Sequence, residues 1–197
     1  MNFRTCGYLR ALVHTVVALC LAAAVWHLPR PAFLIVLAAI AGLFFVFEFV
    51  RANYRWLNVS LFFFLNPLLR PEEWWHPTGA AYVLWGAMAA SFCFEREIAV
   101  TALAYLAVGD AVSSSVGTYF GTRRRGSARY FRCLGCFVSC IGVGATLYFA
   151  GFSIPPEIFF LAAITATIVE SKLFPINDNL GIPLVTGLVM SLLSSSR

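Results

Sequence analysis

Apolar segments long enough to cross a lipid bilayer recur along almost the whole chain, and this repetition limits the possible folds. A transmembrane helix requires about 20 mainly apolar residues. Segments that approach this length lie at residues 9–26, 31–50, 79–94, 98–120, 133–152, 156–174 and 180–193. Only 12% of the residues are charged, against about a quarter in soluble domains. The sequence therefore predicts an all-α integral membrane protein in which residues 1–197 form a single transmembrane domain.

A shorter apolar segment, residues 56–69, decides how the chain crosses the membrane. Its length of about 14 residues is typical of an interfacial or re-entrant helix. If it stays on one side, most Arg and Lys residues face the cytoplasm, as the positive-inside rule requires. If it crossed, the arginines at 123–132 would move outside and this bias would be lost. We therefore predict about seven transmembrane helices plus one short interfacial or re-entrant helix, with the N-terminus in the cytoplasm.

Two local motifs are not assigned a function. The Asn-Val-Ser triplet at Asn58 matches a glycosylation acceptor, but this topology keeps it on the cytoplasmic side, so we interpret it as a chance match. Cys133 and Cys136 form a CxxC pair, whereas a zinc site normally needs a second pair. We expect the cysteines to behave mainly as small apolar residues. The sequence contains no soluble basic module, which argues against nucleic acid as a partner.

Carboxylates and arginines gather on one predicted side of the membrane. The acids that fall at or near the cytoplasmic side are Glu48, Glu72, Glu73, Asp110, Glu170 and Asp178. Mg²⁺ prefers carboxylate oxygens and commonly bridges to substrate phosphates, and arginine matches phosphate oxygens bidentately. This pattern is typical of a site that binds Mg²⁺ and a nucleotide.

The segment around Asp110 combines an acid with a regular row of small residues. Gly109, Ser113, Gly117 and Gly121 recur every four residues, so they share one helix face that allows close helix approach. Asp110 lies on the adjoining face, and because charge inside a membrane is costly, we expect it to be functional. The small residues have two interpretations, which are helix packing and close approach of the backbone to phosphates.

Several other polar residues have structural interpretations beside functional ones. His14 is either a buried, hydrogen-bonded histidine or part of a site. Arg51 is either a topology anchor or a phosphate ligand. Residues 70–79 form either an interfacial loop with tryptophans at headgroup level or part of the site. Residues 177–179 (Asn-Asp-Asn) suit the N-cap of the last helix.

The order of these motifs resembles that of the CTP-dependent lipid kinase family, which includes dolichol kinase, phytol kinase and the CTP-using diacylglycerol kinase. The matching stretches are RALVH (10–14), FEFVR (47–51), LRPEEWWHPTGAAYVLWG (69–86), IAVTALAYLAVGDAVSSSVGTYFG (98–121) and ATIVESKLFPINDNLGIPL (166–184). The chain departs from the family pattern in having Ala11 after Arg10, and in lacking a Lys-Ser-x-Glu-Gly segment after the arginine loop. Arg129 or Arg132 is the candidate replacement for the missing positive charge.

The resemblance implies a Mg²⁺-dependent enzyme that transfers the γ-phosphate of a nucleotide, CTP or another NTP, to the hydroxyl of a membrane lipid alcohol. The expected metal ligands are Asp110, Glu170 and Asp178, and the expected catalytic residues are Asp110 and Glu48. The expected nucleotide-binding residues are Arg10, Arg51, Arg70, Gly117, Gly121, Arg124, Arg129 and Asn179. Further expected site residues are His14, Glu73 and Thr78.

Other functions remain open at the level of the sequence. A cytidylyltransferase that forms a CDP-linked lipid would use similar acids, and a non-catalytic lipid-binding relative would fit the missing segment. A transporter fits less well, because its binding groups belong at mid-membrane. The expected location is a bacterial inner membrane or the endoplasmic reticulum or another organelle membrane, with the active site facing the cytoplasm.

Overall fold

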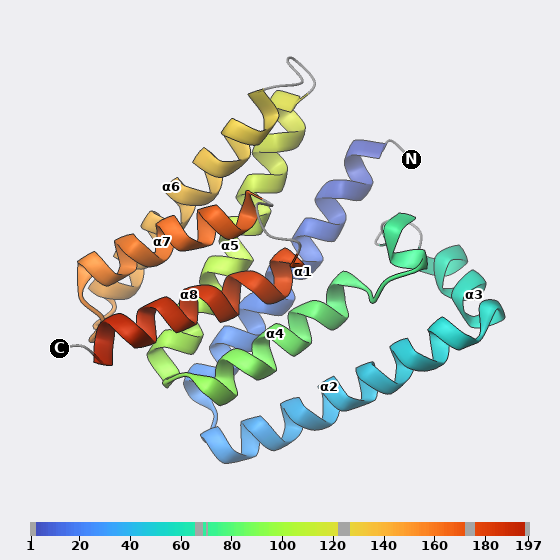
Figure 1. The fold of residues 1–197 in the computed structure, drawn as a ribbon, viewed down its shortest axis with the longest axis horizontal. Coiled ribbons are helices and arrows are strands. Elements are labelled where there is room, and N and C mark those ends of the chain that lie inside the picture. Colours follow the sequence, from blue (N-terminus) through green and yellow to red (C-terminus); the bar gives the residue numbers. More distant parts are fainter. Residues whose placement is uncertain (1–2, 66–68, 70, 122–126, 172–175, 196–197) are drawn as a thin grey trace.

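The computed structural model describes residues 3–65, 69, 71–121, 127–171 and 176–195, without the side chains of 3–8, 71–72, 121 and 127. These parts of the chain form eight α-helices and one short 3₁₀ helix, and no strand (Figure 1). The elements are α1 (Phe3–His27), α2 (Arg30–Asn53), α3 (Arg55–Leu65), η1 (Pro71–Trp74), α4 (Gly79–Cys93), α5 (Arg96–Gly121), α6 (Ser127–Phe149), α7 (Pro156–Glu170) and α8 (Asp178–Ser195). The prediction of an all-α protein is confirmed.

Several helices have the length and composition of membrane spans. Four of the described helices qualify, over Leu9–His27, Arg30–Asn53, Arg96–Phe120 and Ala128–Phe149. Helices α3 and α4 are apolar but shorter, α7 has 15 residues, and α8 has 18 with a proline inside. The structure therefore supports a membrane-embedded protein, while the count of seven spans and the side of the N-terminus stay predictions.

The segment between α2 and α4 begins and ends on the same side of the helix bundle. Arg51, in the last turn of α2, donates to the carbonyl of His76 at 2.7 Å. Glu48 accepts from the backbone N–H of Thr78, the residue before α4, at 3.0 Å. Helix α3 and η1 thus connect the end of α2 to the start of α4 on one side of the molecule (Figure 1). We call this side, marked by Arg51 and Thr78, the upper end.

The opposite side, which we call the lower end, is marked by Arg30 and Arg96. The Arg30 guanidinium donates to the carbonyl of Phe94, at the C-terminus of α4, at 2.9 Å. Arg96 donates to the carbonyl of Leu28, just after α1, at 3.1 Å. Since basic side chains stabilise the free carbonyls at helix C-termini, these arginines fix the turns of the lower end.

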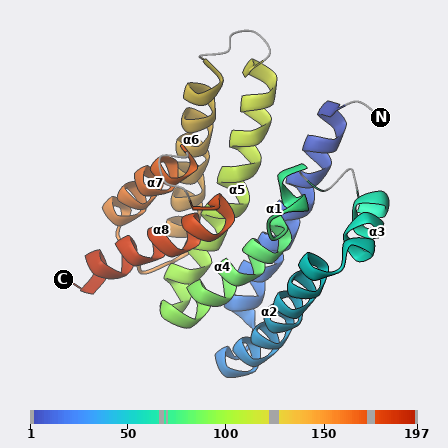
Figure 2. The same cartoon turned by 45° about the vertical axis from the view of Figure 1, so that its right-hand side comes forward.

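Helix α5 lies at the centre and packs against α1, α4, α6, α7 and α8 (Figures 1 and 2). Its buried Tyr105 hydroxyl donates to the carbonyl of Phe159 in α7 at 2.9 Å. A Cβ added to Gly109 would lie 3.2 Å from the Sγ atoms of Cys136 and Cys140 in α6. Glycine therefore allows α5 and α6 to approach closely, as the row of small residues predicts, and both cysteines pack in the core as expected.

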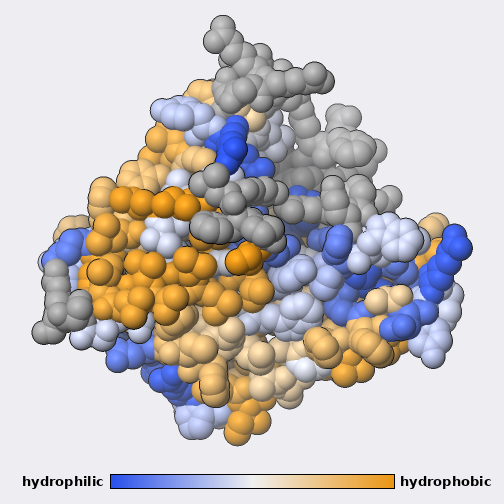
Figure 3. All heavy atoms as spheres, in the orientation of Figure 1, coloured by the Kyte–Doolittle hydropathy of each residue, from blue (hydrophilic) through white to orange (hydrophobic). Residues whose placement is uncertain are grey.

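The outer surface carries many apolar side chains. In Figure 3 hydrophobic residues cover much of the visible face over α7 and α8, whereas hydrophilic residues gather mainly toward the end of α2. The exposed large side chains of α7 and α8 are Phe160, Leu161, Ile168, Leu188 and Leu192. Apolar surface of this extent is costly in water but is favourable in contact with lipid chains.

Candidate functional site

Arg51 is the centre of a buried polar network at the upper end. Its Nε and Nη2 donate to Glu48 Oε2 at 2.8 and 2.6 Å. Its Nη1 donates to Asn58 Oδ1 at 2.7 Å and to the carbonyl of Glu73 at 2.9 Å, and Nη2 also reaches His76. Arg51 is 3% exposed and Glu48 is 5% exposed. We call Arg51, Glu48, Asn58, Glu73 and Thr78 the Arg51 network.

The carboxylates of this network hold the first turn of α4. Glu48 Oε1 accepts from both the backbone N–H and the hydroxyl of Thr78, the latter at 2.6 Å. Thr78 Oγ1 in turn accepts from the N–H of Ala81, as an N-cap residue does. Glu73 Oε1 accepts from the N–H of Gly79 at 2.8 Å. Two carboxylates thus meet the positive end of the α4 dipole, which stabilises the start of this helix.

A second polar group surrounds Glu170, at the end of α7. Glu170 Oε1 accepts from the Ser113 hydroxyl of α5 and from Arg132 Nη2 of α6, both at 2.7 Å. Glu170 is 2% exposed, and its other oxygen, Oε2, is buried with no hydrogen-bond partner among the described residues. A buried oxygen without a partner is uncommon and points to a missing ligand, ion or water.

Two further acids lie close to this pair. Asp110 of α5 interacts electrostatically with both Arg132 and Glu170, and Asp178 of α8 interacts with Arg132. We call Asp110, Ser113, Arg132, Glu170 and Asp178 the Glu170 cluster. Asp110 and Glu170 thus interact with each other, and Asp178 joins them through Arg132. Their assignment as metal ligands stays a prediction.

The side chains of the Glu170 cluster could hold Mg²⁺ only if water and the phosphates of a bound nucleotide supplied further oxygen ligands. Across the described residues, no three His, Cys, Asp or Glu side chains form a group that could hold a metal ion. Mg²⁺ usually binds one or two carboxylates and completes its shell with water and substrate phosphates. Glu170 Oε2 is an oxygen of the required kind, so the cluster suits Mg²⁺ that arrives with a nucleotide.

The Arg51 network and the Glu170 cluster are separate groups on the same end of the bundle. Asn179, in the first turn of α8, donates to the carbonyl of Gly79 at 3.2 Å and so connects α8 to α4. Thr15 of α1 donates to the carbonyl of Ala107 at 3.2 Å, which places the α1 turn that contains His14 beside the α5 turn that ends at Asp110. Glu48 belongs to the network and not to the cluster.

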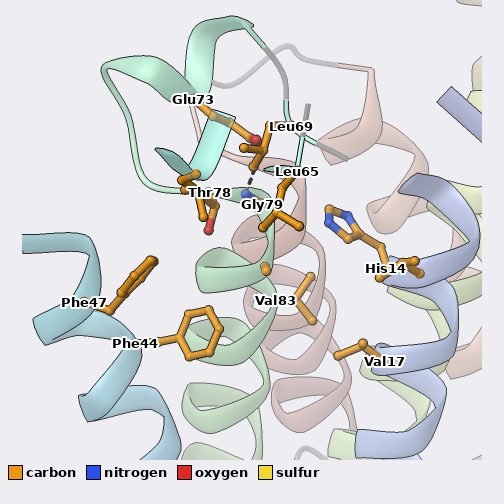
Figure 4. A pocket seen from close by; sticks show the side chains of 13 residues that line it. His14, Val17, Phe44, Phe47, Leu65, Leu69, Glu73, Thr78, Gly79 and Val83 are labelled. Carbon is orange, nitrogen blue, oxygen red and sulfur yellow. Dashed lines mark hydrogen bonds between the residues drawn. The ribbon is translucent and has the colours of Figure 1, made fainter. Parts of the chain in front are cut away.

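A cavity of about 290 Å³ opens between α1, α2, α3 and α4. Figure 4 shows its polar end, where His14 from α1 and Glu73 from η1 lie on either side of Gly79. A Cβ added to Gly79 would lie 2.6 Å from His14 Cε1 and 3.2 Å from Glu73 Oε1. Glycine at this position therefore leaves room for both the imidazole and the carboxylate, whereas the body of the cavity is lined mainly by Val, Leu and Phe side chains.

Other predicted residues have different surroundings. A Cβ on Gly117 would lie 2.7 Å from Cδ of Arg132, so this glycine makes room for the Arg132 side chain. Arg129 is exposed, and Arg10 lies half-buried on α1, one turn before His14. The predictions for Arg70 and Arg124 fall outside the described residues, and the surroundings of Gly121, the last residue of α5, are also outside them.

The structure changes the expected role of Arg51. A guanidinium has five N–H donors, and the five contacts of Arg51 use all of them within the protein. This arrangement leaves no donor for a phosphate, in contrast to the predicted role in nucleotide binding. The side chain of Arg132 is 32% exposed and faces the acids, so it is the arginine that the structure places at the Glu170 cluster.

Two residues of the site were not identified as such from the sequence. Asn58 was interpreted as a chance glycosylation match, and Ser113 as one member of a packing row. Both are buried and hydrogen-bonded to charged side chains. The available signal was a polar side chain inside an apolar segment, because such residues usually face the interior of a helical bundle.

Comparisons with known proteins found a relative of low sequence identity, and they do not indicate an activity for this chain. No family model matches the chain, and no solved structure matches it. The uncharacterized protein RP860 of Rickettsia prowazekii (strain Madrid E) is 25% identical over 162 residues, which cover 79% of this chain and 79% of the relative. The resemblance to lipid kinases therefore stays a prediction.

Proposed function

We propose that the protein is a membrane-embedded phosphotransferase that moves the γ-phosphate of a nucleotide to the hydroxyl of a lipid alcohol. The candidate donors are CTP or another NTP, and the candidate acceptors are a polyprenol, a phytol-like prenol or diacylglycerol. The observation that carries the proposal is the acidic Glu170 cluster, with its unsatisfied buried oxygen, on the same bundle end as an apolar cavity with a polar tip. A charged donor and an apolar acceptor require such a combination.

The proposal assigns phosphate and metal binding to the Glu170 cluster. Mg²⁺ would neutralise charge on the phosphates when bound, and Glu170 and Asp178 are the residues that would hold it. Arg132 would bind phosphate oxygens, since its side chain is partly exposed beside the acids.

Asp110 is the better candidate for the catalytic base. Both oxygens of Glu48 already accept hydrogen bonds from Arg51 and Thr78, so Glu48 is a positioning residue. In the reaction the acceptor oxygen bonds to the γ-phosphorus, the bond from that phosphorus to the bridging oxygen breaks, and the hydroxyl proton passes to Asp110. The products are a lipid phosphate and a nucleoside diphosphate.

The proposal includes the predicted topology. Successive helices of the bundle, apart from α3, alternate between the upper and lower ends (Figure 1), which is compatible with seven crossings. With the N-terminus in the cytoplasm, the upper end would face the cytoplasm, where nucleotides are found. The short helices α4 and α7 would then cross the membrane beside longer neighbours.

The test is a transfer assay with the purified full-length protein in nanodiscs. Mg²⁺, labelled CTP or ATP and a mixture of lipid alcohols are supplied, and the expected products are a labelled lipid phosphate and CDP or ADP. Asp110→Asn should lower the rate by about 100-fold or more, whereas Glu95→Gln, which changes an exposed acid at the lower end, should not.

Each alternative has its own outcome in this assay. Release of pyrophosphate with transfer of CMP would show a cytidylyltransferase and overturn the kinase proposal. Wild-type activity in Asp110→Asn would overturn the assignment of the site. If no nucleotide changes the thermal stability of the protein and no lipid is labelled, the chain is not a phosphotransferase.

A further inference from the structure

The cavity between α1, α2, α3 and α4 has the features of a site for a molecule with one polar end. Its polar groups, His14, Glu73 and Thr78, come from three different elements. Its other side chains are apolar, and they include Phe44 and Phe47 of α2 (Figure 4). A ligand that fits this lining has a hydrogen-bonding group at one end and hydrocarbon along the rest.

The cavity also opens toward the outer surface of the helices. Val13 and Val17 line it and are nevertheless 38% and 39% exposed. Helices α1 and α2 make few contacts with each other, although α1 packs extensively against α5. The exposed Val13 and Val17 therefore place one side of the cavity at the face that lipid chains would cover. A ligand that enters from this side keeps most of its chain in the bilayer.

We propose that this cavity binds the acceptor of the reaction, and that the acceptor is an alcohol with one long apolar chain. Its hydroxyl would meet His14 and Glu73, and the first part of the chain would lie against Phe44 and Phe47. This inference rests on the proposed function, because it names the substrate class of that site.

Two observations favour one chain over the two ester-linked chains of a diacylglycerol. The volume of about 290 Å³ lies at the lower limit of small-molecule pockets, which span roughly 300–1,000 Å³. Apart from the polar tip, the lining residues that the structure describes are apolar, so two ester groups against them would lose their hydrogen bonds to water without replacement.

The polar tip and the proposed base belong to neighbouring turns of α1 and α5. The hydrogen bond from Thr15 to the carbonyl of Ala107 places the His14 turn beside the α5 turn that ends at Asp110. The proposal requires the hydroxyl of an alcohol held at His14 to reach the Glu170 cluster, where the donor nucleotide is proposed to bind. His14 and Glu73 act here as positioning residues for the acceptor.

The experiment measures equilibrium binding of tritiated phytol to the full-length protein without nucleotide. Val17→Trp fills the cavity and should weaken binding by about tenfold or more. Val16→Trp is the matched control, because Val16 neighbours Val17 on α1 but does not line the cavity; its binding should stay within about twofold. Val13→Trp fills the same cavity one turn earlier and replaces Val17→Trp if that variant does not fold.

Competitors test the chemistry of the ligand. Phytane, the same chain without the hydroxyl, and dioleoylglycerol should both compete about tenfold less well than unlabelled phytol. His14→Phe should remove the preference for phytol over phytane. Equal binding by the Val16 and Val17 variants, equal competition by phytane, or equal competition by dioleoylglycerol would each overturn the inference.

The same variants separate this inference from the proposed function. If phytol binding depends on Val17 but no phosphate is ever transferred, the lipid site stands and the phosphotransferase proposal fails. If Val17→Trp leaves both binding and transfer unchanged in an active enzyme, the phosphotransferase stands and the cavity is not the acceptor site.

Discussion

Replacement of Arg51 by methionine should be among the most destabilising single changes in this chain. The variant loses five hydrogen bonds and leaves the carboxylate of Glu48, which is 5% exposed, without its cation. Removal of one partner from a buried ion pair typically costs about 3–5 kcal/mol, because the remaining charge is not compensated. We expect a loss of this size for Arg51→Met.

The loss is measured as a change in thermal unfolding of the purified protein in detergent. For a chain of this length, each kcal/mol lowers the midpoint by about 2–4 °C, so the midpoint should fall by about 6–20 °C. Arg55→Met is the matched control, because Arg55 is exposed and lies four residues further along, at the start of α3. A surface substitution of this kind should change stability by no more than about 0.5 kcal/mol.

A double variant tests the physical reason for the loss. Glu48→Gln removes the charge that Arg51→Met leaves uncompensated, so Glu48→Gln with Arg51→Met should cost less than the sum of the two single changes. The reasoning is wrong if Arg51→Met and Arg55→Met have the same midpoint, or if the double variant shows simple additivity.

Three further predictions concern other contacts at the upper end. Gly117→Ala places a Cβ against the Arg132 side chain and should cost about 1–3 kcal/mol. Gly142→Ala is the control, because its added Cβ meets no atom within 4 Å; it should be neutral or stabilise α6 by up to about 1 kcal/mol. If Gly117→Ala and Gly142→Ala have the same unfolding midpoint, the packing of Arg132 against Gly117 is contradicted. Asn177→Ala removes the side-chain oxygen that accepts from the backbone N–H of Asn179, the second residue of α8. This change should cost about 1 kcal/mol, whereas Asn177→Asp should retain the cap. The unfolding midpoint measures both effects. Glu170→Gln should raise the Mg²⁺ concentration for half-maximal transfer activity by about tenfold, and an unchanged Mg²⁺ titration would exclude Glu170 from the metal site.

Hydropathy located the helices, but local capping decided where α4 and α8 begin. The segment predicted at 156–174 forms α7, which ends at Glu170. The segment predicted at 56–69 overlaps α3 (Arg55–Leu65), and its residues 66–68 lie outside the described residues. Apolar character marks the residues that lipid or core can accept, whereas hydrogen bonds such as those of Thr78 and Asn177 determine where α4 and α8 begin.

The sequence placed the acids and arginines on one end, but it did not predict which acid meets which arginine. Glu48 pairs with Arg51, three residues along the same helix, so helical spacing was a sufficient signal for that pair. Glu170 pairs with Arg132, from a different helix, and that contact depends on how α6 and α7 rotate about their axes. Apolar periodicity is weak in helices that are buried on one side and meet lipid on the other, so the rotation is not readable from sequence.

The alternation of helix directions places the two ends of the chain far apart. Helix α1 begins at the upper end, and α8 finishes at the lower end (Figure 1). A purification tag or fluorescent protein attached before α1 would therefore stand at the upper end, where the proposed nucleotide site lies, and would interfere with assays of that site. The same fusion attached after α8 would leave the upper end uncovered and is the better choice for immobilising the protein.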